Sequence, residues 1–169
     1  MAPLLSAGNR FPDLELVDHG GNIRRLSDLV GGDPTLLHFY RGWWCPKEQT
    51  FFRGLVRLQD EAEVAYTRFV SVSVDPPQVT AAFRAGLGGR WTFLCDPDRV
   101  YLDALDLRET TDTLYNPYVP SAFVLRPGLE IEEAWNGYWF WGRPTAEELR
   151  MAFRRVTRSI RDDWEVPKA

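Results

Sequence analysis

Cysteine is scarce in this sequence, since only Cys45 and Cys95 occur among 169 residues. Two thiols cannot build the disulfide framework of a small secreted domain, and we assign each of them a candidate chemical role in a reducing compartment. Histidine is equally rare, with His19 and His38 alone, and no metal-ligand spacing or Cys/His cluster is present. We therefore expect no metal and no other cofactor.

Clustered positive charge and long apolar runs are missing as well. The formal net charge is −4 and no stretch concentrates Lys and Arg, whereas nucleic-acid and anionic-membrane surfaces need such clusters. No window approaches the roughly 20 apolar residues of a membrane-spanning helix, and the N-terminus lacks the pattern of a signal peptide. The sequence thus predicts a cytoplasmic protein without nucleic-acid or membrane partners.

What the chain does have is enough apolar material for one core. Hydrophobic residues make up 44% of the sequence and aromatic residues 14%, which suits one domain of this length. Linkers, repeats and low-complexity segments are absent. We expect residues 1–169 to form a single domain.

Short β-rich runs alternate with helical patterns, which predicts an α/β fold with a mostly parallel sheet. The runs at 36–40 and 68–74 flank a helix that we expect from Pro46 to about Ala62, because its apolar residues fall at helical spacing and proline suits a first turn. The other expected elements are a hairpin and short helical turn over 14–29, a helix over 77–86, a strand over 91–96, a short helix over 97–105, a strand over 121–128 with an antiparallel return over 129–135, and a last helix that follows the capping-box pair Thr145 and Glu148 and carries an apolar stripe to Trp164.

The stretch "YRGWWCPKE" places Cys45 where a strand should end and a helix should begin. Free backbone N–H groups and the positive end of the helix dipole meet there, and such a site can lower a cysteine pKa from about 8.5 to between about 3.5 and 7.5. Open α/β sheets also place their sites beyond the carboxyl ends of the strands. We favour a nucleophilic thiolate at Cys45 over a cysteine that packs as a small hydrophobe.

Several segments, in chain order, resemble the peroxiredoxin-like (redoxin, or alkyl hydroperoxide reductase/thiol-specific antioxidant) family of the thioredoxin-fold superfamily. The most specific are "HFYRGWWCP" and "VPSAFVLRPG"; "FPDLELVDHGGNIRRLSDL", "VSVD" and "FLCDPDRVYLDAL" are also similar to the family's segments. The resemblance implies a thioredoxin-like α/β fold, with a central mixed β-sheet flanked by helices and an N-terminal β-hairpin. It also implies a peroxidatic or redox cysteine at Cys45, and a cis peptide bond at Pro120 packed against that sulfur.

The sequence departs from the family pattern around Cys45. Glu48 stands where a thioredoxin-type loop has its second cysteine, Gly42 stands where typical peroxiredoxins have Thr or Ser, and His38 stands where they have Pro. Their arginine that holds the thiolate and the peroxide falls on Pro120 and Ser121. A local dithiol is therefore excluded, and peroxide activation needs another donor.

Two charged residues near Cys45 each carry two interpretations. Arg41 can replace the missing arginine with its fork of donors, or it can form an ion pair at the edge of the core. Glu48 can act as a general acid or base if it is desolvated, although a solvated first-turn carboxylate is the commoner case.

Cys95 should lie at the same sheet edge as Cys45. It is either a resolving thiol or, as we favour, a structural one, because a disulfide needs Cα atoms about 4.4–6.8 Å apart and the sequence allows two or more strands between the two cysteines. The aromatic residues Trp43, Trp44, Tyr115, Trp139 and Trp141 either wall an apolar pocket around Cys45 or belong to a homodimer interface.

The function that the sequence favours is thiol-dependent peroxidase chemistry. A small-molecule peroxide would oxidise Cys45 to a sulfenic acid, and an external reductant, either a low-molecular-weight thiol or a thioredoxin-like protein, would restore it. A monothiol disulfide oxidoreductase and a redox-inactive binding module with the thioredoxin fold are the alternatives.

Overall fold

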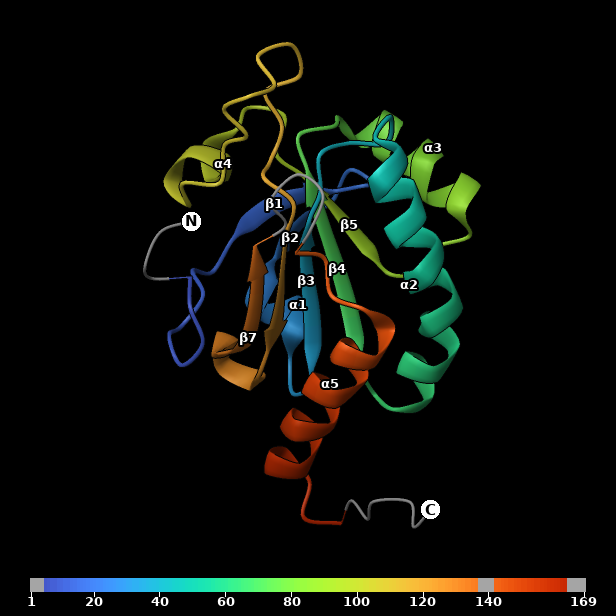
Figure 1. Cartoon of the computed structure of the whole chain (residues 1–169), viewed down its shortest axis with the longest axis vertical. Coiled ribbons are helices and arrows are strands. Elements are labelled where there is room, and N and C mark those ends of the chain that lie inside the picture. Colours follow the sequence, from blue (N-terminus) through green and yellow to red (C-terminus); the bar gives the residue numbers. More distant parts are fainter. Residues whose placement is uncertain (1–4, 137–141, 164–169) are drawn as a thin grey trace.

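The computed structural model describes residues 5–136 and 142–163. A seven-stranded sheet runs through the molecule in the order β2-β1-β5-β4-β3-β6-β7, and helices lie on both of its faces (Figure 1). The strands are β1 (Glu15–Asp18), β2 (Ile23–Arg25), β3 (Thr35–Phe39), β4 (Arg68–Ser73), β5 (Thr92–Cys95), β6 (Ser121–Leu125) and β7 (Ile131–Asn136). The helices are α1 (Leu26–Val30), α2 (Pro46–Val64), α3 (Pro77–Leu87), α4 (Val100–Ala104), the 3₁₀ turn η1 (Pro127–Leu129) and α5 (Ala146–Ile160).

The pairing of the strands makes the sheet mixed. Strands β3, β4 and β5 pair in parallel, whereas β1 with β2, β1 with β5, β3 with β6 and β6 with β7 pair antiparallel. The expected mixed sheet with an N-terminal hairpin is therefore confirmed. The expectation of a mostly parallel sheet was wrong. Strands β1 and β6 run antiparallel to their central neighbours β5 and β3, and each also forms a hairpin with the strand that follows it, β2 or β7.

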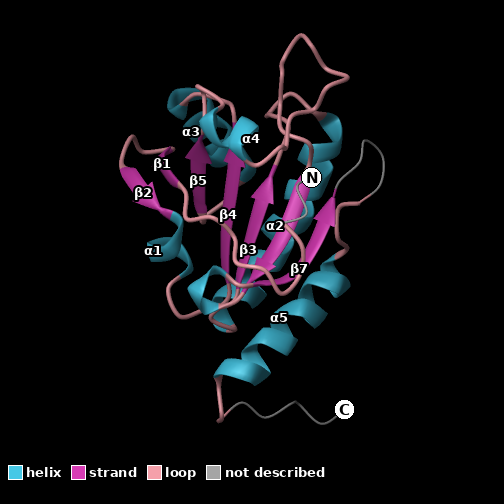
Figure 2. Ribbon diagram, turned by 90° about the vertical axis from the view of Figure 1, so that its left-hand side faces the viewer, coloured by secondary structure: helices cyan, strands magenta, loops and turns pink. Residues whose placement is uncertain are grey.

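Side-chain alternation along the strands divides the interior into two cores. Leu37 and Phe39 of β3 face the layer formed by α1, α4 and the N-terminal segment, and Leu36 and Tyr40 face the layer formed by α2, α3 and α5. Figure 2 shows these two layers on opposite sides of the strands. His38 has the same parity as Leu36 and Tyr40, so it lies under α2.

The helix limits follow the local signals in the sequence. Helix α2 begins at Pro46, and α5 begins after a complete capping box in which Thr145 and Glu148 bond each other's backbone N–H groups. Helix α3 ends at Gly88, which takes the left-handed conformation (φ 72°) that glycine adopts without strain. Trp164, the last residue of the predicted apolar stripe, lies outside the described residues. Within the described ranges, none of the helices combines the length and the apolar character that crossing a membrane requires.

Candidate active site

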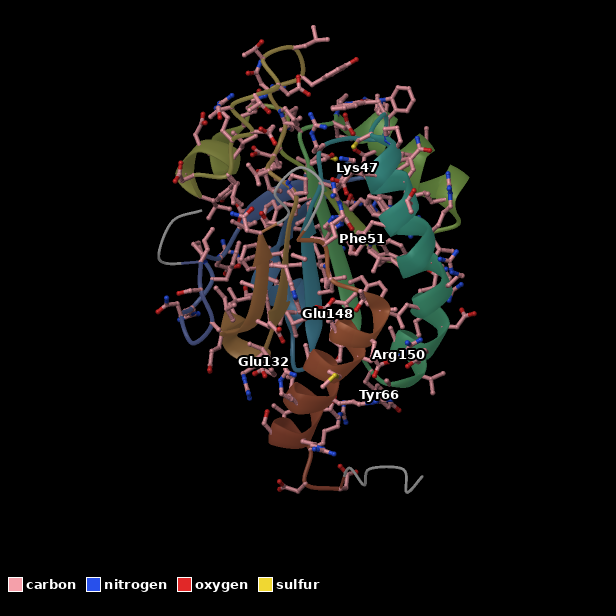
Figure 3. The ribbon with its side chains drawn as sticks, in the orientation of Figure 1. Lys47, Phe51, Tyr66, Glu132, Glu148 and Arg150 are labelled. Carbon is pink, nitrogen blue, oxygen red and sulfur yellow. The ribbon has the colours of Figure 1, made fainter. Side chains whose placement is uncertain are left out.

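Cys45 lies at the junction between β3 and α2, at the carboxyl edge of the parallel strands. It is the N-cap residue of α2, with Pro46 in the first turn, as the sequence predicted. Its backbone N–H donates to the carbonyl of Gly42 (3.2 Å), so residues 42–45 form a tight turn above the sheet. The residue is only 2% exposed, and both cysteines are free thiols. Figure 3 shows how Lys47 and Phe51 continue from this junction along the first turns of α2, with Glu148 and Arg150 of α5 further along the molecule.

Arg41 lies beside the sulfur and is paired at the same time. Its Nη1 lies 4.0 Å from Cys45 Sγ, and its Nη2 donates to Asp112 Oδ2 at 2.6 Å. Both side chains of this ion pair are about 15% exposed, and Arg41 Nε is buried without a hydrogen-bond partner among the described residues. The two interpretations made from the sequence therefore describe one arrangement, in which the same guanidinium forms the ion pair and approaches the thiol.

Gly42 explains why this site has no hydroxyl at the family's Thr/Ser position. Its φ is +151°, and a Cβ built there would lie 2.6 Å from Nε1 of Trp44. Any side chain at this position would therefore collide with the indole ring. Donors for a reacting oxygen have to come from another residue.

The aromatic residues predicted to surround Cys45 separate into two groups. Trp44 stacks on Tyr115 with ring centroids 4.1 Å apart and lies under the guanidinium of Arg41 at 4.9 Å. Trp43 is half exposed, and it lines an apolar groove of about 730 Å³ between α2 and α3 together with Val79, Phe83 and Leu87. Trp139 and Trp141 lie outside the described residues. Of the five, Trp44 and Tyr115 are thus brought together beside Arg41.

Glu48 is fully buried, so the expectation of a solvated first-turn carboxylate was wrong. Arg143, in the segment before α5, donates from Nε and Nη2 to its two oxygens, and the backbone N–H of Arg41 donates to it at 3.4 Å. Burial acts to raise the pKa of Glu48, but His38 and Arg143 outweigh it and leave this pKa below its ordinary value. The buried carboxylate of Glu48, which belongs to α2, therefore binds both the 41–45 turn and the segment before α5.

His38 lies behind Glu48 in the same interior layer. Its Nε2 is 3.5 Å from Glu48 Oε2, and its ring packs against Tyr40, Phe51 and Phe52. Burial lowers the pKa of His38 below its ordinary value, despite the neighbouring carboxylate. The imidazole is therefore neutral at neutral pH.

Pro120 is buried directly before β6, at the same sheet edge as Cys45, because Ser121 pairs with Phe39 at the end of β3. Its peptide bond is trans, as are all peptide bonds of the described residues, so the expected cis bond was wrong. The preceding segment is held extended by the bridge between Arg108 and Tyr118 and by the hydrogen bond from Val119 N–H to the carbonyl of Leu107 (2.7 Å). This pairing brings the chain into β6 with the trans geometry that X–Pro bonds prefer.

Cys95 ends β5 and pairs in register with Ser73 of β4. One strand, β4, therefore lies between β5 and β3, fewer than the two or more that the sequence allowed. Cys95 is 1% exposed, and burial raises its pKa above the ordinary value. A buried protonated thiol is a poor nucleophile.

Sequence reasoning did not find Asp112 and Arg143. Each is a single charged residue without a motif, and it reaches the site across 71 or 95 positions of chain. The only local signal was that Arg143 lies two residues before the capping box of α5. A distant ion pair of this kind is not encoded in spacing.

Comparison with known proteins shows which family the chain resembles over most of its length. The model of the AhpC/TSA family matches residues 7–134. A Mycobacterium tuberculosis protein named "Putative peroxiredoxin Rv1608c" is 29% identical over 157 residues, which cover 73% of this chain and 100% of the relative.

Solved structures share the fold. Peroxidoxin BcpB from Mycobacterium tuberculosis superposes with a TM-score of 0.77 at 21% identity, over 93% of this chain and 99% of that one. Reduced Prx3 from Vibrio vulnificus, in complex with hydrogen peroxide, gives 0.78 at 19% identity, over 89% and 96%. At these identities the likeness concerns the fold, and it confirms the expected thioredoxin-like architecture.

Proposed function

Because the chain belongs to the AhpC/TSA family, we propose that it is a thiol-dependent peroxidase in which Cys45 is the peroxidatic residue. The observation that carries this assignment is the arrangement of Cys45 at the N-terminus of α2 with the Arg41 guanidinium 4.0 Å from its sulfur. A helix N-terminus and a cation both favour the thiolate, which is the nucleophile.

The proposed reaction is a displacement on oxygen. The Cys45 thiolate attacks the terminal oxygen of the peroxide, the O–O bond breaks, and the leaving oxygen takes a proton to depart as water or an alcohol. The sulfur then carries a sulfenic acid. Negative charge moves onto the leaving oxygen during this step, so fixed donors directed at that oxygen lower the barrier.

Arg41 is the proposed source of those donors. Its Nε–H is buried and has no partner among the described residues, while Nη2 is engaged by Asp112. The indole ring of Trp44 leaves no space for a hydroxyl-bearing side chain at position 42. A guanidinium presents several N–H groups in one plane and remains charged throughout the reaction. We therefore assign it the role that typical relatives give to an arginine on the strand equivalent to β6.

The sulfenic acid is proposed to be reduced by an external thiol. Cys95 is buried, its pKa is raised, and β4 separates its strand from β3. These features favour a structural role for Cys95 over a resolving one. Whether the reductant is a low-molecular-weight thiol or a thioredoxin-like protein, and whether the protein forms a homodimer, stay predictions.

Glu48 is assigned a positioning role and not an acid–base role. A carboxylate held by both Nε and Nη2 of Arg143, with a lowered pKa, remains ionised at neutral pH and has no proton to give. It fixes the turn that carries Cys45 through the backbone N–H of Arg41.

The test mixes reduced protein with stoichiometric hydrogen peroxide, and separately with an organic hydroperoxide, and follows intact mass in the presence of a sulfenate trap. Fast oxidation confined to Cys45, absent from Cys45→Ser and unchanged in Cys95→Ser, is the expected result. A subsequent loss of two hydrogens would instead make Cys95 the resolving thiol. Oxidation no faster than that of a free thiol would contradict the peroxidase assignment and leave disulfide exchange or partner binding.

A further inference from the structure

Arg41 is held from two directions. Its Nη2 donates to Asp112 Oδ2 at 2.6 Å, and its carbon atom Cζ lies over the ring of Trp44, 4.9 Å from the ring centroid. An arginine side chain has several rotatable bonds, so its donors point at a given atom only when such contacts restrict it. The direction of the remaining donors toward Cys45 thus depends on these two contacts.

The two oxygens of Asp112 have separate contacts. Oδ1 accepts the backbone N–H groups of Leu114 (3.2 Å) and Tyr115 (3.0 Å), which closes a turn in the loop between α4 and β6. Among the described residues, Oδ2 accepts from Arg41 alone. The loop therefore holds the carboxylate in place independently of its contact with the guanidinium.

That loop is anchored in turn to α4. Arg99, the N-cap residue of α4, donates from Nη2 to the carbonyl of Tyr115 (3.0 Å) and from Nε to the carbonyl of Asn116 (3.1 Å). Figure 1 shows this loop rising beyond the carboxyl edge of the sheet, near the start of α2. A continuous set of contacts connects α4, the loop, Arg41 and the sulfur.

We propose that Asp112 is a positioning residue of the peroxidase reaction, which holds the Arg41 guanidinium so that its free donors face the Cys45 sulfur and the oxygens of an incoming peroxide. This inference rests on the proposed function. The opposing role for the same contact is competition, in which Asp112 occupies Arg41 and keeps it from the thiolate. The two roles predict opposite changes when the charge of Asp112 is removed.

Asp112→Asn is the informative substitution. The amide oxygen can keep the turn contacts of Oδ1, while the amide group presents N–H to Arg41 in place of a carboxylate oxygen. Asp103→Asn is the matched control, because Asp103 forms an exposed ion pair with Arg108 in the same region. Circular dichroism and thermal unfolding establish that each variant is folded.

The measurement is the second-order rate constant of Cys45 oxidation as a function of pH, up to a plateau where the thiol is fully ionised. Positioning predicts a plateau between about 10- and 100-fold lower in Asp112→Asn, unchanged in Asp103→Asn. It also predicts that Asp112→Asn has no further effect in an Arg41→Ala background, because Asp112 acts through Arg41.

Three results would overturn the proposal: an unchanged plateau, a faster reaction, or an equal loss in the Arg41→Ala background. Each of them, obtained while the wild type oxidises far faster than a free thiol, refutes the role of Asp112 and leaves the peroxidase assignment standing. A wild type as slow as a free thiol refutes the peroxidase assignment, and the role of Asp112 with it.

Discussion

The indole ring of Trp44 occupies the space that a side chain at position 42 would need. Introducing there the hydroxyl that typical relatives carry should therefore destabilise the protein. Gly42→Ser would place Cβ 2.6 Å from the indole Nε1 at a positive φ, so we expect a loss of about 1–3 kcal/mol in the free energy of unfolding and slower oxidation of Cys45. Urea unfolding measures the first effect. Gly32→Ser is the control, since a Cβ there meets nothing within 4 Å. Equal stability of the two variants would contradict the steric account.

The buried charge of Glu48 should also contribute to stability. Glu48→Gln removes a buried negative charge and leaves Arg143 without its counter-ion, so we expect about 3–5 kcal/mol of destabilisation. The control is Glu147→Gln, which weakens an exposed ion pair with Arg150 and should cost about 1 kcal/mol or less. Chemical denaturation measures both. A loss in Glu48→Gln no larger than in the control would show that the pair is not structurally important.

Single residues set the limit of what the sequence could predict. Cys45 was found because its position at a helix start depends on local signals, namely the end of an apolar run and a proline. Glu48 was placed correctly on the helix, but its burial depends on Arg143, which lies 95 positions away. A local pattern predicts where a residue lies in its element and not which distant charge meets it.

Among the elements, the loop between α4 and β6 is joined to the turn that carries Cys45 by the stack of Tyr115 on Trp44. Cys45 is 2% exposed, so a bulky reagent reaches it only after a local opening, and we expect movement of this loop to supply that opening. The stack contributes about 0.5–1.5 kcal/mol to the closed state, and Tyr115→Ala should therefore accelerate alkylation of Cys45 by a bulky maleimide about 2- to 10-fold.

Stopped-flow alkylation at fixed pH measures this opening. Leu114→Ala is the matched control, because Leu114 is 80% exposed in the same loop. If both substitutions leave the rate at the wild-type value, the stack does not hold the loop closed.

The elements themselves were largely predictable. Caps and prolines marked α2 and α5, and the apolar runs marked β3 and β4, because these signals act within a few residues. The cis bond expected at Pro120 came from the family resemblance alone, and the bond is trans. The sequence also showed no sign that the segment before β6 pairs with Leu107 and Arg108, a contact between loops. The residues of two paired loops show no periodic pattern in the sequence, so their pairing could not be predicted from it.

At the scale of the whole molecule, the parallel strands bring the site together. Strands β3, β4 and β5 run in one direction, so the turn of Cys45, Asp75 after β4 and Asp96 after β5 meet at one edge, where Asp75 accepts the backbone N–H of Trp43 (3.1 Å). The same sheet buries His38 beneath α2. Neutral His38 and ionised Glu48 are therefore buried next to each other between the sheet and α2.

This buried pair predicts that the protein loses stability in mild acid. Burial lowers the pKa of His38 below 6.5 in the folded state. As the pH falls below about 6.5, His38 is therefore protonated in the unfolded chain while it is still neutral in the folded protein. The free energy of unfolding should then decrease from pH 7 to pH 5, by at most about 1.4 kcal/mol per pH unit for one such group. The folded pKa of Glu48 is also lowered, so below about pH 4.5 the unfolded chain takes up a proton on Glu48 more readily than the folded protein does. This adds a further loss of free energy of unfolding.

Urea unfolding at pH 7, 6 and 5 tests this, with His38→Leu as the informative variant, because it removes the titrating group and keeps an apolar side chain in the layer. We expect a smaller decrease between pH 7 and pH 5 in this variant. His19→Asn is the second comparison, because the pKa of His19 is also lowered by partial burial and by Arg84. If His38→Leu keeps the full wild-type pH dependence while His19→Asn abolishes it, the acid sensitivity arises at the hairpin and not beneath the active site.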